Sequence, residues 1–274
     1  MKHDSLGARL KAYEGTHDRE LLPDCFVIAR IDGRSFSRLT KETLRDLEKP
    51  FDAGFRDAMI AASRTLAADS GFDVAYAYTQ SDEISLLFAR DASAFGRRAA
   101  KWLSILASTA AATLSLRLGL PATFDARLLE LPNESLVRDY FRWRYEDAAR
   151  NALSGHCYWH LRGRGLDGTA ATRELERLSV PQRHELLHTA GRPFQSVPAW
   201  QRRGVGLWPE RVLREGRDPR TGEAKVATRR EWRIELELPE RDAYGAWIDA
   251  RIRDAVGADD AAAPDPTTSL SARS

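Results

Sequence analysis

Cys25-Phe26-Val27-Ile28-Ala29-Arg30-Ile31-Asp32-Gly33-Arg34 is the stretch that decides the fold. The run from Phe26 to Asp32 is rich in β-favouring apolar residues and predicts a buried strand. Gly33 tolerates the sharp turn with which the chain must leave that strand. An acidic side chain, Asp32, is thereby held at the end of a strand.

A second acidic turn lies at Gln80-Ser81-Asp82-Glu83, between two strand-like runs that extend from about residue 73 to residue 88. If the strand ending in Asp32 pairs beside this hairpin, Asp32 and Asp82 come together at one edge of a sheet. Mg²⁺ prefers oxygen ligands and is usually held by one or two carboxylates and substrate phosphates. Two such ions clamp the attacking and leaving oxygens of an in-line displacement. The pair therefore indicates Mg²⁺-dependent phosphoryl chemistry.

The residues after Asp32 suit a phosphate ligand. Glycine leaves room for a triphosphate to approach the backbone at Gly33 and Arg34, and the following Ser35, Ser37 and Arg38 add donors. The sequence alone does not exclude an ordinary turn without a metal at both places, because Asp-Gly and Ser-Asp are common in turns.

Apolar periodicity and breaker residues predict the other elements. The expected helices cover 4–20, a segment opened by 49–52 and running to about 68, 95–118, 134–153, 171–178, 180–190 and 241–256. Further strands are expected at 123–131, entering at 202–208, and at 231–238. The order βαββαβ is typical of the ferredoxin-like or polymerase-palm arrangement, an α+β fold with an antiparallel sheet and two helices on one face.

This order suggests three regions. Residues 1–132 would form a palm-like catalytic core, residues 133–256 an extension of helices and strands packed on the palm, and residues 257–274 a disordered tail. The net charge of +2 gives no global basicity, so any RNA contact must come from local patches. The two cysteines, Cys25 and Cys157, are expected to be reduced core residues. The N-terminus has no apolar leader and no run of eighteen apolar residues occurs, so we expect a cytoplasmic protein without a membrane partner.

Seven motifs stand in an order that resembles the tRNA-histidine guanylyltransferase family, between about Arg30 and Leu207. They are Asp32-Gly33-Arg34-x-Phe36, Lys49-Pro50-x-Asp52, Ser81-Asp82-Glu83-x-Ser85, Arg97-Arg98-x-x-Lys101, Phe124-Asp125-x-Arg127, Leu136-x-Arg138-Asp139-Tyr140-x-x-Trp143-Arg144 and Cys157-Tyr158-Trp159. That family is similar to polymerase palms but extends RNA in the 3′ to 5′ direction. Each motif alone is weak, whereas seven in order are specific.

The resemblance implies a division of roles. Asp32, Asp82 and Glu83 would be catalytic, with two Mg²⁺ ions bound by Asp32, the Gly33 carbonyl and Asp82. The nucleotide, GTP and also ATP, would be held by Asp32, Gly33, Arg34, Ser35, Phe36, Ser37, Lys49, Ser81, Asp82 and Lys101. Phosphate or RNA contacts would come from Lys49, Arg97, Lys101 and Arg127. The implied partner is tRNA, and the implied assembly is a homotetramer.

The implied reaction is attack of the 3′-hydroxyl of GTP on an activated 5′-phosphate of tRNA, which displaces pyrophosphate or AMP. Two departures from the family pattern bear on it. Ala149-Arg150-Asn151-Ala152 stands where eukaryotic members carry His-Ile-Asn-Asn, and Ser37 replaces a frequent histidine. Bacterial and archaeal relatives with such changes resemble template-dependent repair enzymes, so we expect the bacterial like-protein branch.

Other interpretations stay open from the sequence. Arg138, Trp143 and Arg144 fit either a direct RNA contact or a salt-bridged helix with one buried tryptophan. The pairs His156/His160 and His184/His188 lack an accompanying carboxylate spacing, which argues against a metal site. A palm-type nucleotide cyclase and a non-catalytic tRNA-binding protein remain the alternative functions. A cyclase would need no basic positions for RNA, and an intact acidic set argues against a decayed site.

Overall fold

The computed structural model describes residues 2–40, 44, 46–217, 220 and 224–256, so the tail predicted to be disordered lies outside the described part. Six strands form one antiparallel sheet in the order β4-β1-β3-β2-β5-β6. The first four are β1 (Phe26–Gly33), β2 (Val74–Gln80), β3 (Glu83–Phe88) and β4 (Phe124–Leu131). Their order confirms the predicted ferredoxin-like palm.

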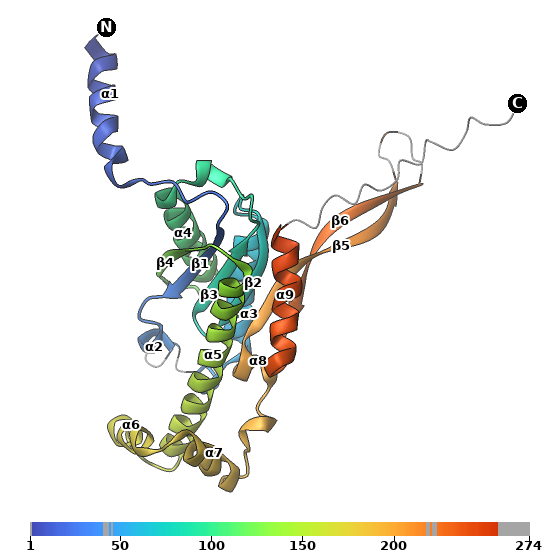
Figure 1. The fold of residues 1–274 in the computed structure, drawn as a ribbon. Helices are drawn as coiled ribbons and strands as arrows, with labels where there is room; N and C mark the ends of the chain where they lie inside the picture. Colours follow the sequence, from blue (N-terminus) through green and yellow to red (C-terminus); the bar gives the residue numbers. More distant parts are fainter. Residues whose placement is uncertain (1, 41–43, 45, 218–219, 221–223, 257–274) are drawn as a thin grey trace, which may run out of the picture.

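Helices cover both faces of this sheet (Figure 1). α3 (Ala53–Ala68) and α4 (Ala99–Leu118) pack on one face, where they share a core with alternate residues of the strands. α5 (Glu134–Gly163) and α9 (Arg241–Val256) pack on the other face and form a second core. The expected pair of helices on one face is thus confirmed, and the C-terminal extension supplies the opposite layer.

β1 is buried on both faces, which explains why its sequence is almost continuously apolar. Successive side chains of a strand point to opposite faces. Val27, Ala29 and Ile31 belong to the core beneath α3 and α4, and Ile28 belongs to the core beneath α5 and α9. Asp32 has the same parity as Ile28, so its side chain lies on the α5 side of the sheet.

The remaining elements extend this framework. β5 (Val205–Arg217) and β6 (Ala224–Glu235) join the sheet beside β2 and run on as a two-stranded ribbon that projects from the body (Figure 1). The short helices are α1 (Lys2–Glu14), α2 (Phe36–Arg38), α6 (Gly168–Arg177), α7 (Val180–Thr189) and α8 (Ala199–Arg203), with 3₁₀ turns at Gly15–His17, Ala94–Arg97 and Phe194–Ser196. α6 and α7 lie at the far end of α5 (Figure 1).

Several predicted boundaries were wrong for identifiable reasons. α5 continues to Gly163, ten residues beyond the expected end, because the single glycine at 155 lies inside the helix and does not terminate it. α4 begins at Ala99 rather than at residue 95, since Phe95, Gly96 and Arg97 have positive φ angles.

In the C-terminal part, the expected strand entry at 202–204 is the end of α8 and its cap, and β5 starts at Val205. β6 covers Ala224–Glu235 instead of 231–238, although Leu238 is buried as the alternating pattern suggested.

Within the described residues, α4 has the length and apolar composition of a membrane-spanning helix. The same composition occurs in helices that fill a protein core. α4 buries Trp102, Leu106, Ala110 and Leu114 against α3 and the sheet, so its apolar side is used in the fold.

Candidate active site

The strand pairing brings the predicted carboxylates together. Asp32 is directly opposite Glu83 in the β1–β3 register, and the amide of Gly33 donates to the carbonyl of Asp82 at 3.0 Å. Asp125 of β4 lies opposite Asp32 on the other side of β1. The predicted meeting of Asp32 and Asp82 at the ends of β1 and β3 is therefore confirmed.

Gly33 is required by this close approach. A Cβ at Gly33 would lie 2.4 Å from the ring of Phe36 and 2.9 Å from Asp82 Cβ. Phe36 is itself buried, with its ring 6.0 Å from that of Phe55 and 5.2 Å from that of Phe124. The Asp-Gly-Arg-x-Phe motif thus has a local explanation: the phenylalanine anchors the turn in the core and the glycine admits both the ring and the second acidic turn.

The surroundings of Asp82 disfavour its charged form. Burial raises the pKa of Asp82, and the nearby charge of Asp32 raises that pKa further, while a hydrogen bond from Ser81 Oγ at 3.0 Å opposes the shift. Among the residues that the structure describes, neither Asp32 nor Asp82 forms an ion pair. Two adjacent acidic groups without a counter-charge are a place where a cation would be stabilised.

Glu83, in contrast, has its own counter-charge. Arg144 of α5 donates to both carboxylate oxygens of Glu83, from Nε at 2.7 Å and from Nη2 at 2.6 Å. Burial raises the pKa of Glu83, and the attraction to Arg144 opposes that rise. Arg144 also contacts Asp147 at 3.1 Å. Glu83 therefore ties the acidic turn to α5, and its catalytic role stays a prediction.

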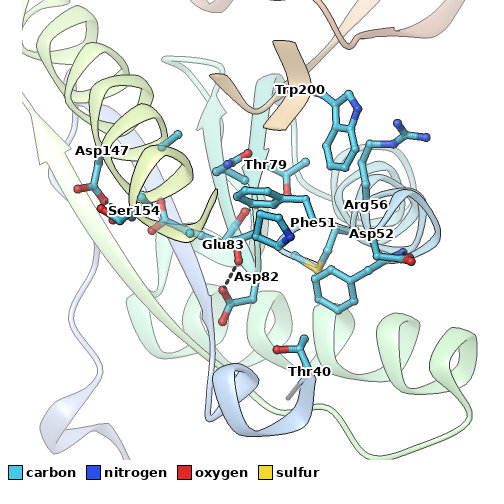
Figure 2. Close-up of a pocket in the computed structure, with 18 of the residues that line it drawn as sticks. Thr40, Phe51, Asp52, Arg56, Thr79, Asp82, Glu83, Asp147, Ser154 and Trp200 are labelled. Atoms are coloured by element: carbon cyan, nitrogen blue, oxygen red, sulfur yellow. Dashed lines mark hydrogen bonds between the residues drawn. The ribbon is translucent and has the colours of Figure 1, made fainter. Parts of the chain in front are cut away.

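A cavity of about 760 Å³ opens beside the acidic turn. Figure 2 shows Asp82 and Glu83 on one side of it, with Phe51, Trp200 and Arg56 grouped on another. The Arg56 guanidinium lies 4.7 Å from the centre of the Trp200 ring, and Phe51 meets Trp200 edge to face at 6.2 Å. The cavity thus has an acidic end and an aromatic end.

The Lys49-Pro50-x-Asp52 motif forms a wall of this cavity. Lys49 Nζ donates to the carbonyls of Thr40 at 2.7 Å and Leu44 at 3.3 Å, and burial lowers its pKa. Asp52 caps α3 by accepting from the Phe55 amide at 2.8 Å. In this structure both residues fix the loop, and a phosphate contact of Lys49 stays a prediction.

Three basic residues assigned to phosphate or RNA do not line this cavity. Arg97 donates to the carbonyls of Leu21, Leu22 and Ala92 at 3.3, 2.7 and 2.8 Å, so it holds the chain ahead of β1. Arg127 contacts Asp125 at 3.2 Å, and Lys101 is exposed in the first turn of α4. Their contacts with RNA stay predictions.

The backbone of the phosphate segment is arranged around Ser35. Ser35 has φ 62°, which starts α2, and the amide of Arg34 donates to the carbonyl of Thr123 at 2.9 Å. α2 carries Ser37. The segment therefore turns away from β1 immediately after Gly33, next to the acidic pair.

The sequence did not reveal the hydrogen bonds that hold Trp200 in the wall of the cavity. Gln80 Nε2 donates to the carbonyl of Gln201 at 2.9 Å, and His156 Nε2 lies 2.9 Å from Gln201 Oε1. These bonds fix α8, and with it Trp200, to the end of β2 and to α5. The segment 191–204 is irregular and has no apolar period, so only its tryptophan offered a signal.

No group of three or more His, Cys, Asp or Glu side chains within the described residues is arranged to hold a metal ion. The two carboxylates and the Gly33 carbonyl nevertheless fit Mg²⁺, which commonly takes one or two carboxylates and completes its shell with water and substrate phosphates. The uncompensated charge of Asp32 and Asp82 and the close backbone approach at Gly33 support that fit.

The sequence matches two family models, which together cover most of the chain. Residues 7–132 match the family described as tRNAHis guanylyltransferase (Thg1), and residues 135–236 match the Thg1 C-terminal domain. The sequence is 32% identical over 214 residues to the probable tRNA(His) guanylyltransferase of Drosophila melanogaster, which covers 74% of this chain and 73% of that protein.

Two similar solved structures are of a bacterial tRNA(His) guanylyltransferase (Thg1)-like protein. The complex with GTP has a TM-score of 0.67 and 26% identity, and the complex with ATP has a TM-score of 0.71 and 25% identity. Each covers 92% of this chain and 99% of the other chain.

Proposed function

The chain belongs to the tRNA(His) guanylyltransferase family and is a nucleotidyltransferase of that family, and from this premise we propose that it extends the 5′ end of a tRNA in the 3′ to 5′ direction. The observation that carries the proposal is the pair Asp32 and Asp82 at the acidic end of the cavity. Phosphoryl transfer depends mainly on positioning and on neutralising charge. A pair of uncompensated carboxylates beside a cavity supplies the place for both.

We assign Mg²⁺ binding to Asp32, Asp82 and the Gly33 carbonyl. When bound, Mg²⁺ neutralises phosphate charge and orients the attacking and leaving oxygens. Glu83 acts differently from the other two carboxylates, because its charge is already paired with Arg144. Its role is to keep the acidic turn in register with α5.

The cavity suits one nucleoside triphosphate, since its volume lies within the range of about 300 to 1,000 Å³ that is usual for small-molecule sites. The triphosphate would leave the cavity at Asp32 and Ser81, which line it, and extend along residues 33–37, which follow outside the lining. The base would lie toward Phe51 and Trp200, whose rings give it an apolar wall. Complexes of the bacterial Thg1-like protein with GTP and with ATP support a purine nucleotide here.

The proposed reaction forms one bond and breaks one. The 3′-hydroxyl oxygen of the bound nucleotide attacks the 5′-phosphorus of the tRNA and loses its proton to solvent. Pyrophosphate leaves from a 5′-triphosphorylated end, or AMP leaves from an adenylylated end. The chain's own contribution is to hold both reacting groups beside Asp32 and Asp82.

We propose that addition is templated by the opposite strand. Ala149, Arg150 and Ala152 replace three of the four residues that eukaryotic members use at this place, and Arg150 is engaged with Asp147 on the surface of α5 at 3.1 Å. The homotetramer and the cytoplasmic location stay predictions, which light scattering and cell fractionation would measure.

The test is nucleotide incorporation into a tRNA that lacks its first 5′ nucleotide, with each labelled NTP, Mg²⁺, and either a monophosphate or a triphosphate 5′ end. We expect the base complementary to the 3′ strand to be added. Asp32→Ala and Asp82→Ala should reduce incorporation by at least about a thousandfold while circular dichroism is unchanged. Asp242→Ala, which removes an exposed carboxylate from α9, is the matched control and should keep full activity.

Each other outcome identifies an alternative. Guanosine addition that ignores the template would establish the strict tRNA(His) activity. A cyclic nucleotide formed without RNA would establish a cyclase. RNA binding without incorporation would establish a non-catalytic protein, and wild-type rates in Asp32→Ala would remove the metal assignment.

A further inference from the structure

α5 exposes one of its aromatic residues beside the active site. Tyr140 and Phe141 are buried in the core beneath α5, but 46% of the surface of Trp143 is accessible. The apolar burial that usually explains a tryptophan in a helix therefore accounts for only part of this side chain. Of the two interpretations that the sequence left open, the salt bridges of Arg138 and Arg144 are present, but the tryptophan is not buried.

The ring of Trp143 is held by residues that belong to the active site. The Arg144 guanidinium lies 4.6 Å from the ring centre and that of Arg30 lies 5.7 Å from it, while Tyr140 meets its edge at 6.0 Å. Arg144 is fixed by its two hydrogen bonds to Glu83. Both arginines line the cavity that contains Asp32, so the tryptophan lies next to that lining without being part of it.

The ring contacts the guanidinium groups of Arg30 and Arg144, and Asp139, Glu146 and Asp147 stand three or four positions from it on α5. Arg30 has no ion pair among the described residues, and its Nε is buried without a hydrogen-bond partner. Arg127 lies directly opposite Arg30 in the β1–β4 register, and its contact with Asp125 is exposed to solvent. Exposed ion pairs contribute little, so Arg127 is available to another anion at small cost. Arg142, next to the tryptophan, is exposed as well.

An exposed aromatic ring among arginines is complementary to RNA rather than to an apolar protein surface. Bases that are not paired stack on aromatic side chains in sequence-tolerant single-strand recognition, and adjacent cations attract the phosphates. An apolar partner would have to bury the guanidinium of Arg30, which interacts electrostatically with Glu83 but forms no ion pair among the described residues, and this burial is costly.

We infer that Trp143 is the stacking surface for an unpaired nucleobase at the acceptor end of the RNA substrate. The inference rests on the proposed function and adds to it a contact that holds the RNA end beside Asp32 and Asp82. The base belongs either to the single-stranded 3′ end or to a 5′-terminal nucleotide whose base pair has opened. The incoming nucleotide has a separate aromatic wall at Phe51 and Trp200.

The test is an equilibrium titration that needs no catalysis. A tRNA lacking its first 5′ nucleotide carries 2-aminopurine either at its 5′ terminus or at the first unpaired 3′ position. Fluorescence and affinity are measured with the wild-type protein, Trp143→Ala, Trp143→Phe and Leu136→Ala. Leu136 is the matched control, because it is an apolar residue of the same helix with 42% of its surface exposed.

We expect the wild-type protein to quench the probe at one of the two positions, which identifies the stacked base. Trp143→Ala should lose the quench and bind the RNA about tenfold more weakly, while Trp143→Phe keeps most of the affinity. GTP affinity and circular dichroism should be unchanged in all variants. Leu136→Ala should behave as wild type.

The inference is overturned if Trp143→Ala keeps the quench or binds RNA within twofold of wild type. It is also overturned if Leu136→Ala loses as much affinity, which would indicate a general apolar contact, or if the wild-type protein quenches neither probe. Failure of the proposed function is seen separately: RNA would bind and show stacking, but no nucleotide would be incorporated.

Discussion

Replacing Arg144 by methionine is the most informative perturbation of the fold around the site. Arg144 and Glu83 are 12% and 14% exposed, and they share two hydrogen bonds of 2.7 and 2.6 Å. Arg144→Met keeps the length of the side chain but leaves the Glu83 carboxylate without its partner. A buried pair that loses one member typically costs about 3 to 5 kcal/mol.

Both groups line the adjacent cavity and are not fully shielded from solvent, so we expect the lower value, about 3 kcal/mol of unfolding free energy. For a chain of this size that corresponds to a fall of roughly 6 to 12 °C in the melting temperature. The measurement is urea denaturation followed by tryptophan fluorescence and by far-UV circular dichroism. Glu83→Gln and the double variant complete a cycle, in which the double variant should lose less than the sum of the single losses by at least about 1 kcal/mol.

A second ion pair on the same helix is the matched control. Arg138 of α5 contacts Asp249 of α9 at 2.5 Å, but these side chains are 36% and 30% exposed. Arg138→Met should therefore cost no more than about 1 kcal/mol. Equal losses for Arg138→Met and Arg144→Met, or an additive cycle for Arg144 and Glu83, would refute the argument that burial makes the second pair important.

Two further predictions concern α5 and its neighbours. Burial raises the pKa of the Cys157 thiol to about 11, so iodoacetamide at pH 8 should leave Cys157 unmodified in the native protein and alkylate it in denaturant; mass spectrometry of the peptides decides this, and modification of the native thiol would contradict it. Burial also lowers the pKa of His156, and the positive charge of Arg192 lowers it further, while the hydrogen bond with Gln201 raises it. The net pKa is lowered, so the imidazole of the folded protein binds a proton less readily than that of the unfolded chain. Stability should therefore be fully present above the unfolded pKa near 6.5 and decrease as pH falls through it, and His156→Gln should flatten that part of the stability profile in urea denaturation; an unchanged profile would show that His156 does not contribute.

The acidic pair could be predicted from the sequence because its determinants are local. A strand that ends at Asp32-Gly33 and a hairpin whose turn carries Asp82 each follow from a few neighbouring residues. The helix order then leaves few ways to pair these strands. The register of the antiparallel pair β1–β3 then places Asp32 opposite Glu83, next to Asp82.

The residues that complete the site depend on contacts between distant segments. Arg144 reaches Glu83 across 61 positions, and Gln80 reaches Gln201 across 121. No local pattern distinguishes such an arginine from one in a solvated helix. Arg97 is the converse case, because a basic residue near a helix start suggested a phosphate contact, whereas its guanidinium holds carbonyls more than 70 positions away.

α5 connects these observations. Through Arg144 it fixes the turn that carries Asp82, and with the preceding residue, Trp143, it places an aromatic ring beside the same guanidinium. Because one guanidinium contacts both the tryptophan ring and Glu83, displacement of the acidic turn and displacement of the ring cannot be independent. An RNA base stacked on Trp143 would therefore be positioned relative to Asp82 by the helix itself, and the accuracy of that position would depend on the rigidity of the Arg144–Glu83 pair.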